Sequence, residues 1–203
     1  MNNKNQSFSE ISKAYLKHLQ NSFTDDIFNQ IEKLSNHLYR VWTESKSIYI
    51  CGNGGSGANA IHIANDLLYG AGACGDPPSV KGLKVEALTS NSAIITCLGN
   101  DIGYENIFSH QLKNKASNGD LLIALSGSGN SQNIVNALVM AKQLGVYSYA
   151  ILGYSGGKSL TYADSSIHFQ VNDMQIAEDT QLIVGHLCMQ WLTKNKPNFD
   201  DSL

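Results

Sequence analysis

Two short loops rich in serine and glycine carry residue types that bind phosphate groups. The first runs from Gly52 to Gly57 (GNGGSG) and the second from Ser126 to Ser131 (SGSGNS). Each loop directly follows an apolar run. The pattern after each loop predicts a helix. Serine hydroxyls, backbone amides and the positive end of a helix dipole all favour phosphate oxygens. The two loops therefore predict a site for a small phosphorylated ligand.

The first loop also matches the glycine pattern of dinucleotide-binding proteins, GxGxxG, at Gly52, Gly54 and Gly57. That function also needs an acidic residue at the end of the second strand, where it holds the ribose. Glu86 falls inside the expected strand instead, and a Thr-Ser-Asn run ends it. A small phosphorylated ligand fits better, and we expect no nucleotide cofactor. A sharp turn that binds no ligand is the remaining alternative for this loop.

Two histidines and two carboxylates lie at helical spacing in two separate segments. His62 and Asp66 are four residues apart in one expected helix, and Glu178 and His186 are eight apart in the last one. Each pair therefore falls roughly on one helical face. Imidazoles and carboxylates are common ligands of divalent metals. The spacing predicts that the four side chains converge on one metal ion, with ordinary hydrogen-bonded histidines as the alternative.

The rest of the chain predicts the elements that position these groups. Short apolar or β-branched runs predict five strands, at residues 47–51, 83–88, 120–126, 147–153 and 166–171. Helical patterns lie between and after them, at residues 58–69, 92–98, 104–115, 134–144, 158–163 and 175–193. This alternation predicts one α/β domain over residues 1–203, with a parallel sheet covered by helices on both faces. The Gly/Pro-rich stretch at 70–82 is expected to be a mobile loop near a site.

Two amphipathic helices are expected before the first strand, at about residues 8–43, with Thr24 or Asp25 beginning the second. Apolar residues of the second helix recur every three or four positions, at Ile27, Ile31, Leu34, Leu38 and Val41. This apolar surface exceeds what one sheet edge can bury, so the helices are expected to contribute to a homo-oligomer.

Composition excludes several classes of protein. Fourteen Lys and Arg against 17 Asp and Glu give a net charge of −3, so no basic surface for nucleic acid or an anionic membrane is expected. The polar N-terminus and the lack of a stretch of about 20 apolar residues predict a cytoplasmic protein. Four widely spaced cysteines without a CxxC pair argue against a disulfide framework and a cysteine zinc finger.

Several motifs together resemble the SIS-domain (sugar isomerase) family, and within it the phosphoheptose isomerase branch. They are CGNGGSGANAIHIANDL, LGND, LIALSGSGNSQNIVNA, ILGYSGG and AEDTQLIVGH, and the resemblance as a whole spans about Ile27 to Trp191. The resemblance implies a flavodoxin-like five-stranded parallel sheet and a homotetramer with active sites at subunit contacts. It also implies interconversion of sedoheptulose 7-phosphate and D-glycero-D-manno-heptose 7-phosphate, a step toward bacterial surface heptoses.

The resemblance implies roles for individual residues. The phosphate contacts of the family match the serines Ser56, Ser126, Ser128 and Ser131 and the backbone amide of Gly127. Gly127 stands where relatives often have Thr. Asn53, Gly54 and Asp101 match substrate-binding positions. The matching positions also bind zinc in some relatives, which implies one possible zinc ion per subunit at His62, Asp66, Glu178 and His186. Glu178 replaces a Gln of these relatives, and Gly70 replaces an Arg found in many.

The acid–base pair implied by the resemblance is Asp66 and His186, with Asp66 in place of a Glu. Aldose–ketose isomerisation moves a proton between C1 and C2 through an enediol, so it needs a base for carbon and a group that relays protons between oxygens. A carboxylate and an imidazole suffice. The alternative is a non-catalytic, phosphosugar-binding regulatory SIS protein, including the type that assists assembly at replication initiation.

Overall fold

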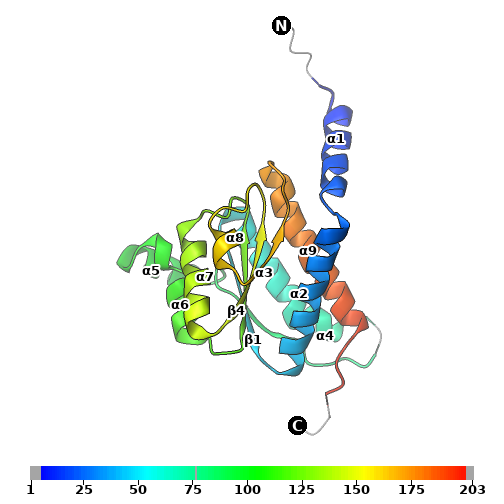
Figure 1. The fold of residues 1–203 in the computed structure, drawn as a ribbon. Helices are drawn as coiled ribbons and strands as arrows, with labels where there is room; N and C mark the ends of the chain where they lie inside the picture. The colour runs from blue at the N-terminus through cyan, green and yellow to red at the C-terminus, as the bar shows by residue number, and fades with distance from the viewer. Residues whose placement is uncertain (1–5, 76, 200–203) are drawn as a thin grey trace.

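The computed structural model describes residues 6–75 and 77–199, which form a sheet between two layers of helices (Figure 1). The strands of this part of the chain are β1 (Ser47–Gly52), β2 (Lys84–Ala87), β3 (Leu121–Ser126), β4 (Tyr147–Leu152) and β5 (Ser165–His168). They pair in parallel in the order β2-β1-β3-β4-β5. This is the flavodoxin-like order, so the predicted sheet is confirmed.

The helices occur in the order expected, with added short ones. The longer helices are α1 (Phe8–Asn21), α2 (Asp25–Thr43), α3 (Gly54–Asn65), α5 (Ser92–Asp101), α6 (Ser109–Lys115), α7 (Gln132–Leu144) and α9 (Met174–Lys194). The short ones are the π-helix η1 (Asp66–Gly70), α4 (Ala71–Ala73), the 3-10 helix η2 (Tyr104–Asn106) and α8 (Ser159–Tyr162). The predicted loop at 70–82 therefore begins as a helical turn.

Two hydrophobic clusters cover the two faces of the sheet. One lies between the sheet and α2, α3 and α9, and the other between the sheet and α6 and α7. Alternate side chains of β1 enter different clusters: Ile48 and Ile50 enter the first, and Tyr49 and Cys51 the second. All six residues of the central strand β3 are buried. Burial on both faces explains why the strands read as continuous apolar runs.

The helix that follows the first glycine-rich loop begins earlier than the sequence predicts. α3 begins at Gly54, four residues before the predicted start at 58, so most of the glycine-rich loop is its first turn. Gly54 has a φ of +55°, a conformation that glycine adopts without a steric penalty. This residue lets the chain turn directly from β1 into α3.

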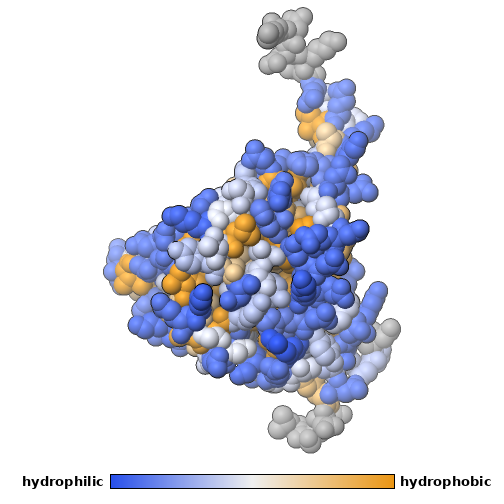
Figure 2. All heavy atoms as spheres, viewed as in Figure 1, coloured by the Kyte–Doolittle hydropathy of each residue, from blue (hydrophilic) through white to orange (hydrophobic). Residues whose placement is uncertain are grey.

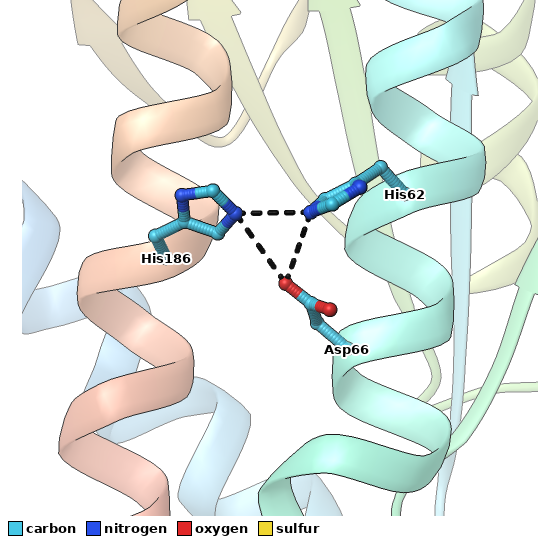
Figure 3. A group of neighbouring side chains, drawn as sticks. All are labelled: His62, Asp66 and His186. Carbon is cyan, nitrogen blue, oxygen red and sulfur yellow. Dashed lines mark hydrogen bonds and ion pairs between the residues drawn. The ribbon is translucent and has the colours of Figure 1, made fainter.

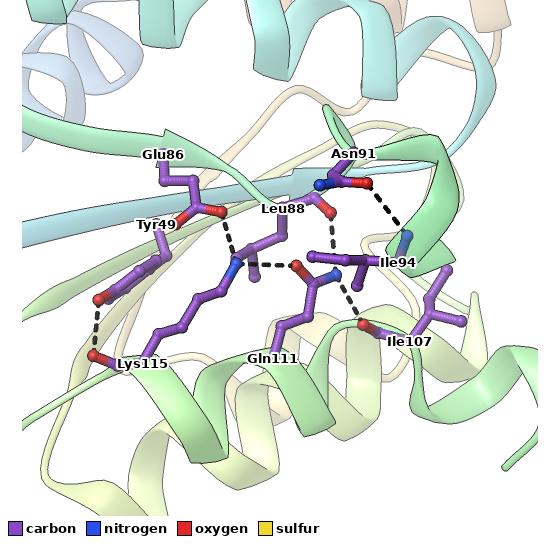
Figure 4. Close-up of polar contacts among 8 residues, drawn as sticks. All are labelled: Tyr49, Glu86, Leu88, Asn91, Ile94, Ile107, Gln111 and Lys115. Atoms are coloured by element: carbon purple, nitrogen blue, oxygen red, sulfur yellow. Dashed lines mark hydrogen bonds and ion pairs between the residues drawn. The ribbon is translucent and has the colours of Figure 1, made fainter. Parts of the chain in front are cut away.

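A polar network holds α6 against the edge of the sheet (Figure 4). Lys115 Nζ lies 2.5 Å from Glu86 Oε1 on β2, and Tyr49 on β1 donates a hydrogen bond to the Lys115 carbonyl. Gln111 Nε2 donates to the carbonyls of Leu88 and Ile107. Glu86, which lies inside the strand as the sequence predicts, therefore has a structural partner.

The N-terminal helix α1 extends beyond the body of the molecule (Figure 1). Among its described residues 8–21 no side chain is buried, and Phe8, Ile11 and Leu16 are 87%, 53% and 63% exposed. Figure 2 shows apolar side chains among polar ones on this helix. Tyr15 ties it to α9 through a 2.5 Å hydrogen bond from its hydroxyl to Asp179. The contribution of α1 to an oligomer stays a prediction.

The second helix, α2, buries the predicted apolar stripe against the sheet and α9. Thr24 is its N-cap, because the Thr24 hydroxyl accepts the N–H of Ile27 at 3.3 Å. Within the described residues, no helix combines the length and apolarity needed to cross a bilayer.

Candidate active site

The two serine-glycine loops lie side by side because β1 and β3 are neighbours in the sheet. The chain leaves β1 toward β2 on one side and leaves β3 toward β4 on the other. Such a switch point, at the carboxyl ends of the strands, is where open α/β sheets bind ligands. The sheet order therefore brings the predicted phosphate-binding loops together.

The second loop offers several hydroxyl donors. The Ser126 hydroxyl accepts the N–H of Gly129 at 3.0 Å, and the Ser128 hydroxyl accepts that of Asn130 at 3.2 Å. Each hydroxyl hydrogen is then left to donate elsewhere. Ser131 precedes α7, and its side chain caps no N–H of the described helix. The loop thus presents three hydroxyls at the N-terminus of a long helix, a combination that suits an anion.

Gly127 stands where relatives often have Thr. The space that a side chain at this position would need is occupied by Met174. A Cβ placed on Gly127 would lie 2.6 Å from Sδ of Met174, at the start of α9. Thr at this position would therefore require Met174 to move. The backbone N–H of Gly127 remains as the group that this position contributes.

The first loop is tied to the second through an amide pair. Asn53 Nδ2 donates to Asn133 Oδ1 at 2.8 Å, and Asn133 Nδ2 donates back to Asn53 Oδ1 at 2.8 Å. The Tyr104 hydroxyl also donates to Asn53 Oδ1, at 3.0 Å. Sequence reasoning missed Asn133 and Tyr104, because these contacts join positions 80 and 51 residues apart and no local pattern marks them.

An open cleft of about 290 Å³ adjoins this amide pair. Polar and small residues of its lining include Asn53, Gly54, Thr89 and Tyr104, and its other side is apolar. Ser56, in the first turn of α3, is 4% exposed, and its hydroxyl bonds to no other described residue. The first loop therefore places the Asn53 amide in the lining of a cleft of ligand size, whereas Ser56 is not among the described residues that line it.

Two histidines and an aspartate meet between α3 and α9 (Figure 3). His62 Nε2 lies 2.9 Å from His186 Nε2, and Asp66 Oδ2 lies 3.4 Å from the first nitrogen and 3.6 Å from the second. The side chains are 50% (His62), 45% (His186) and 20% (Asp66) exposed, so solvent and ligands reach them. Three of the four predicted metal ligands, His62, Asp66 and His186, therefore do converge.

Local backbone features bring these three side chains together. Asp66 is the first residue of the π-helix η1, and π-turns are frequent at functional sites. Gly185, beside His186, allows α9 to approach α3 closely, because a Cβ there would lie 2.6 Å from Cγ1 of Ile63. A larger residue at this position would separate the two histidines.

The three side chains fit a divalent metal ion. Ligand atoms bound to a tetrahedral zinc ion at about 2.0–2.1 Å lie about 3.3 Å from one another. The three distances of 2.9, 3.4 and 3.6 Å bracket this value. Three protein ligands with an open fourth position are typical of catalytic zinc sites.

The structure does not bring Glu178 into this group, and its part in metal binding stays a prediction. The three ligand atoms of His62, Asp66 and His186 form the group without it, and the Glu178 carboxylate packs on Gly55, where a Cβ would lie 2.4 Å from Oε2. Eight residues of helix separate Glu178 from His186 by about 12 Å along the axis. A shared helical face therefore does not bring the two side chains to one point.

Asp101 ends α5, which projects from the body of the molecule (Figure 1). Its carboxylate accepts hydrogen bonds from Asn100 Nδ2 at 2.7 Å and from the Cys97 thiol at 3.4 Å, and the latter raises the pKa of that thiol. It is not among the described residues that line the cleft. Contact between Asp101 and a substrate stays a prediction.

Comparison with known proteins assigns the family. The SIS domain matches residues 13–153, which cover most of the chain. The chain belongs to the SIS-domain family. This SIS domain is 35% identical over 172 residues to the phosphoheptose isomerase of Sulfurimonas denitrificans, covering 84% of this chain and 85% of the relative. It is 39% identical over 159 residues to that of Akkermansia muciniphila, covering 77% and 80%.

Solved structures agree with the fold of this SIS domain. Phosphoheptose isomerase from Neisseria gonorrhoeae superposes with a TM-score of 0.81 at 22% identity, covering 93% of this chain and 100% of that one. The family match ends at residue 153, before α9, so His186 lies outside the matched residues. The SIS domain thus accounts for the two loops and for His62 and Asp66, and α9 adds His186.

Proposed function

We propose that this SIS domain is a phosphoheptose isomerase that interconverts sedoheptulose 7-phosphate and D-glycero-D-manno-heptose 7-phosphate. Asp66 supports this most directly, because its carboxylate lies within 3.6 Å of two imidazole nitrogens. The names and coverage of the curated relatives support the same reaction. The product would serve the synthesis of surface heptoses, as the resemblance implies.

The separation between the loops and the cluster suits this substrate. His62 and Asp66 follow Ser56 on one continuous helical segment by six and ten residues, which corresponds to about 9 and 15 Å along the axis. In a heptose 7-phosphate, C1 and C2 lie at the end of the chain opposite to the phosphate. A phosphate held at the loops therefore directs the reacting carbons toward Asp66 and His186.

Asp66 and His186 have distinct tasks in the reaction. The Asp66 carboxylate removes a proton from C1 of the ketose, and the electron pair forms the double bond of the enediol while O2 gains a proton. Asp66 then returns the proton to C2 as the hydroxyl on C1 loses its own proton and becomes the aldehyde. His186 moves the proton between O1 and O2, because an imidazole ring can both donate and accept a proton.

His62, Asp66 and His186 would hold a divalent metal in this site. Such an ion would supply a Lewis acid that makes the carbon-bound proton of the substrate easier to remove. The three side chains already lie 2.9, 3.4 and 3.6 Å apart at their facing atoms, which supports this role because little rearrangement is needed for binding.

Isotope exchange tests the activity directly. The protein is incubated in heavy water with a panel of ketose phosphates, with zinc supplied, and proton NMR follows the hydrogens bound to carbon. We expect exchange at C1 and formation of the aldose with sedoheptulose 7-phosphate, and loss of both in Asp66→Asn. A protein that binds phosphosugars but exchanges no carbon-bound hydrogen would overturn the isomerase and leave a regulatory binding protein.

A further inference from the structure

We propose that Tyr104 is a positioning residue that fixes the side-chain amide of Asn53 with an N–H group directed to the substrate. The inference rests on the proposed function for the identity of the substrate. It assigns a role to a residue outside the two loops and outside the histidine–aspartate cluster. Its evidence is a set of three hydrogen bonds at the end of β1.

One N–H donor of the Asn53 side chain remains unused after its three hydrogen bonds are counted. An amide oxygen has two lone pairs, and Asn53 Oδ1 uses both, accepting from Asn133 Nδ2 at 2.8 Å and from the Tyr104 hydroxyl at 3.0 Å. Asn53 Nδ2 has two hydrogens and donates one to Asn133 Oδ1 at 2.8 Å. Its second hydrogen has no acceptor among the described residues. Asn53 is also the residue before α3, yet its side chain caps no N–H of that described helix.

The amide pair alone does not determine this orientation. If both amides turned over together, Asn53 and Asn133 would still exchange two hydrogen bonds, with nitrogen and oxygen reversed. The Tyr104 hydroxyl breaks this symmetry. An amide oxygen accepts better than a phenol oxygen, whose lone pair is delocalised into the ring, so the hydroxyl favours the arrangement in which it faces Asn53 Oδ1.

Tyr104 is itself held in place independently of Asn53. It begins η2, and the side chain of Asn136 on α7 donates to the carbonyl of Glu105 at 2.9 Å. Tyr104 therefore belongs to a segment anchored on α7, although α5 before it projects from the body (Figure 1). The 56% exposed Tyr104 side chain lines the same cleft as Asn53.

The unused N–H of Asn53 determines which kind of ligand atom it can bind. It suits an acceptor oxygen, such as a phosphate, hydroxyl or carbonyl oxygen of a sugar phosphate. With Tyr104→Phe the two amide orientations become nearly equivalent, and part of the protein presents an oxygen instead of a donor. A lost or misdirected neutral hydrogen bond weakens binding by roughly two- to twelvefold.

Two measurements compare the wild type with Tyr104→Phe and with the control Tyr162→Phe. Tyr162 is a 45% exposed tyrosine whose hydroxyl bonds to no described residue. In the absence of ligand, nitrogen–proton NMR of the Asn53 side-chain amide should give one set of signals in the wild type and in Tyr162→Phe. In Tyr104→Phe the signals should double or broaden. Unchanged Asn53 signals in Tyr104→Phe would overturn the inference whether or not the protein is an isomerase.

Kinetics and a double mutant then test the link to the substrate. Tyr104→Phe should raise KM for sedoheptulose 7-phosphate roughly two- to twelvefold, with a smaller effect on kcat and an unchanged pH profile. In an Asn53→Asp background, Tyr104→Phe should add little, because the donor that it orients is gone. Fully additive effects would mean that Tyr104 acts without Asn53 and would overturn the proposal. If the wild type lacks isomerase activity, the proposed function fails, and the same cycle is measured on phosphosugar affinity by calorimetry.

Discussion

His62 Nε2 and His186 Nε2 face each other at 2.9 Å across two different helices. A hydrogen bond at this distance requires that one ring donates and the other accepts, so the two facing nitrogens share a single proton. Asp66 Oδ2 lies beside both. A divalent ion bound by both of these nitrogens would displace that proton from between them, and the ring that carries it would then hold it on Nδ1 instead.

The first prediction concerns metal content. Protein purified without a chelator should carry about one zinc per subunit, and His62→Ala should lose most of it, because one of three converging ligands is removed. Elemental analysis measures this. Equal metal content in wild type and His62→Ala would show that the cluster is structural.

Glu178→Gln is the matched control for this measurement. The Glu178 carboxylate of the wild type packs on Gly55 and lies outside the group formed by His62, Asp66 and His186. Zinc content should therefore stay at the wild-type level in Glu178→Gln. A loss equal to that of His62→Ala would mean that Glu178 reaches the metal after all.

The second prediction concerns catalysis. Asp66→Asn and His186→Ala should each lower turnover by roughly 10²–10⁴-fold, the usual size of a general acid–base contribution, while phosphosugar binding persists. Steady-state kinetics with a calorimetric binding control measures both. His110→Ala, which removes an exposed histidine on α6, should retain full turnover.

Asp66→Glu tests whether the site is matched to the shorter side chain. In this protein the aspartate already reaches both imidazoles. The longer carboxylate should displace them, and turnover on heptose 7-phosphate should fall between wild type and Asp66→Asn. Higher turnover than wild type would show instead that the reach of Asp66 limits the reaction.

The third prediction concerns the phosphate loop. Ser128→Ala should weaken phosphosugar binding by roughly 1–3 kcal/mol, the contribution of a hydrogen bond to a charged group. Isothermal calorimetry gives the affinity, with Ser79→Ala, an exposed serine outside the loops, as the control. An affinity equal to the control would place the phosphate elsewhere.

The fourth prediction concerns assembly. The apolar side chains exposed on α1 need a partner surface, so the protein should be a homotetramer at micromolar concentration. Replacing Phe8, Ile11 and Leu16 with Ser should shift the mass measured by light scattering toward smaller species. A monomeric wild type would contradict this assignment.

The fifth prediction concerns acid stability. Burial, assisted by the neighbouring Arg40, lowers the pKa of His37 from 6.5 to about 4, and Glu44 opposes the shift. The unfolded chain therefore binds more protons between these two values, and the free energy of unfolding should fall as pH falls from about 6.5 toward 4. Urea unfolding across this range should show a flatter pH profile for His37→Gln than for wild type. Parallel profiles would exclude His37 as the source.

Local patterns in the sequence were sufficient for the elements and the loops. Apolar runs between helical patterns predicted all five strands, because burial on both faces of a parallel sheet leaves few polar positions in them. The spacing of His62 and Asp66 also predicted their proximity, since residues four apart in a helix lie one above the other. The onset of α3 was missed, because Gly54 permits an immediate turn that local helix preference does not reveal.

Relations between distant elements were decided only by the tertiary structure. Helical spacing gives the face of a side chain but not its height against a neighbouring helix, so the meeting of His62 with His186 and the exclusion of Glu178 depended on how α3 and α9 pack. The amide pair of Asn53 and Asn133 likewise depends on the neighbouring positions of β1 and β3 in the sheet. These contacts join residues 80 to 124 positions apart, and no pattern within either segment encodes the distance between them.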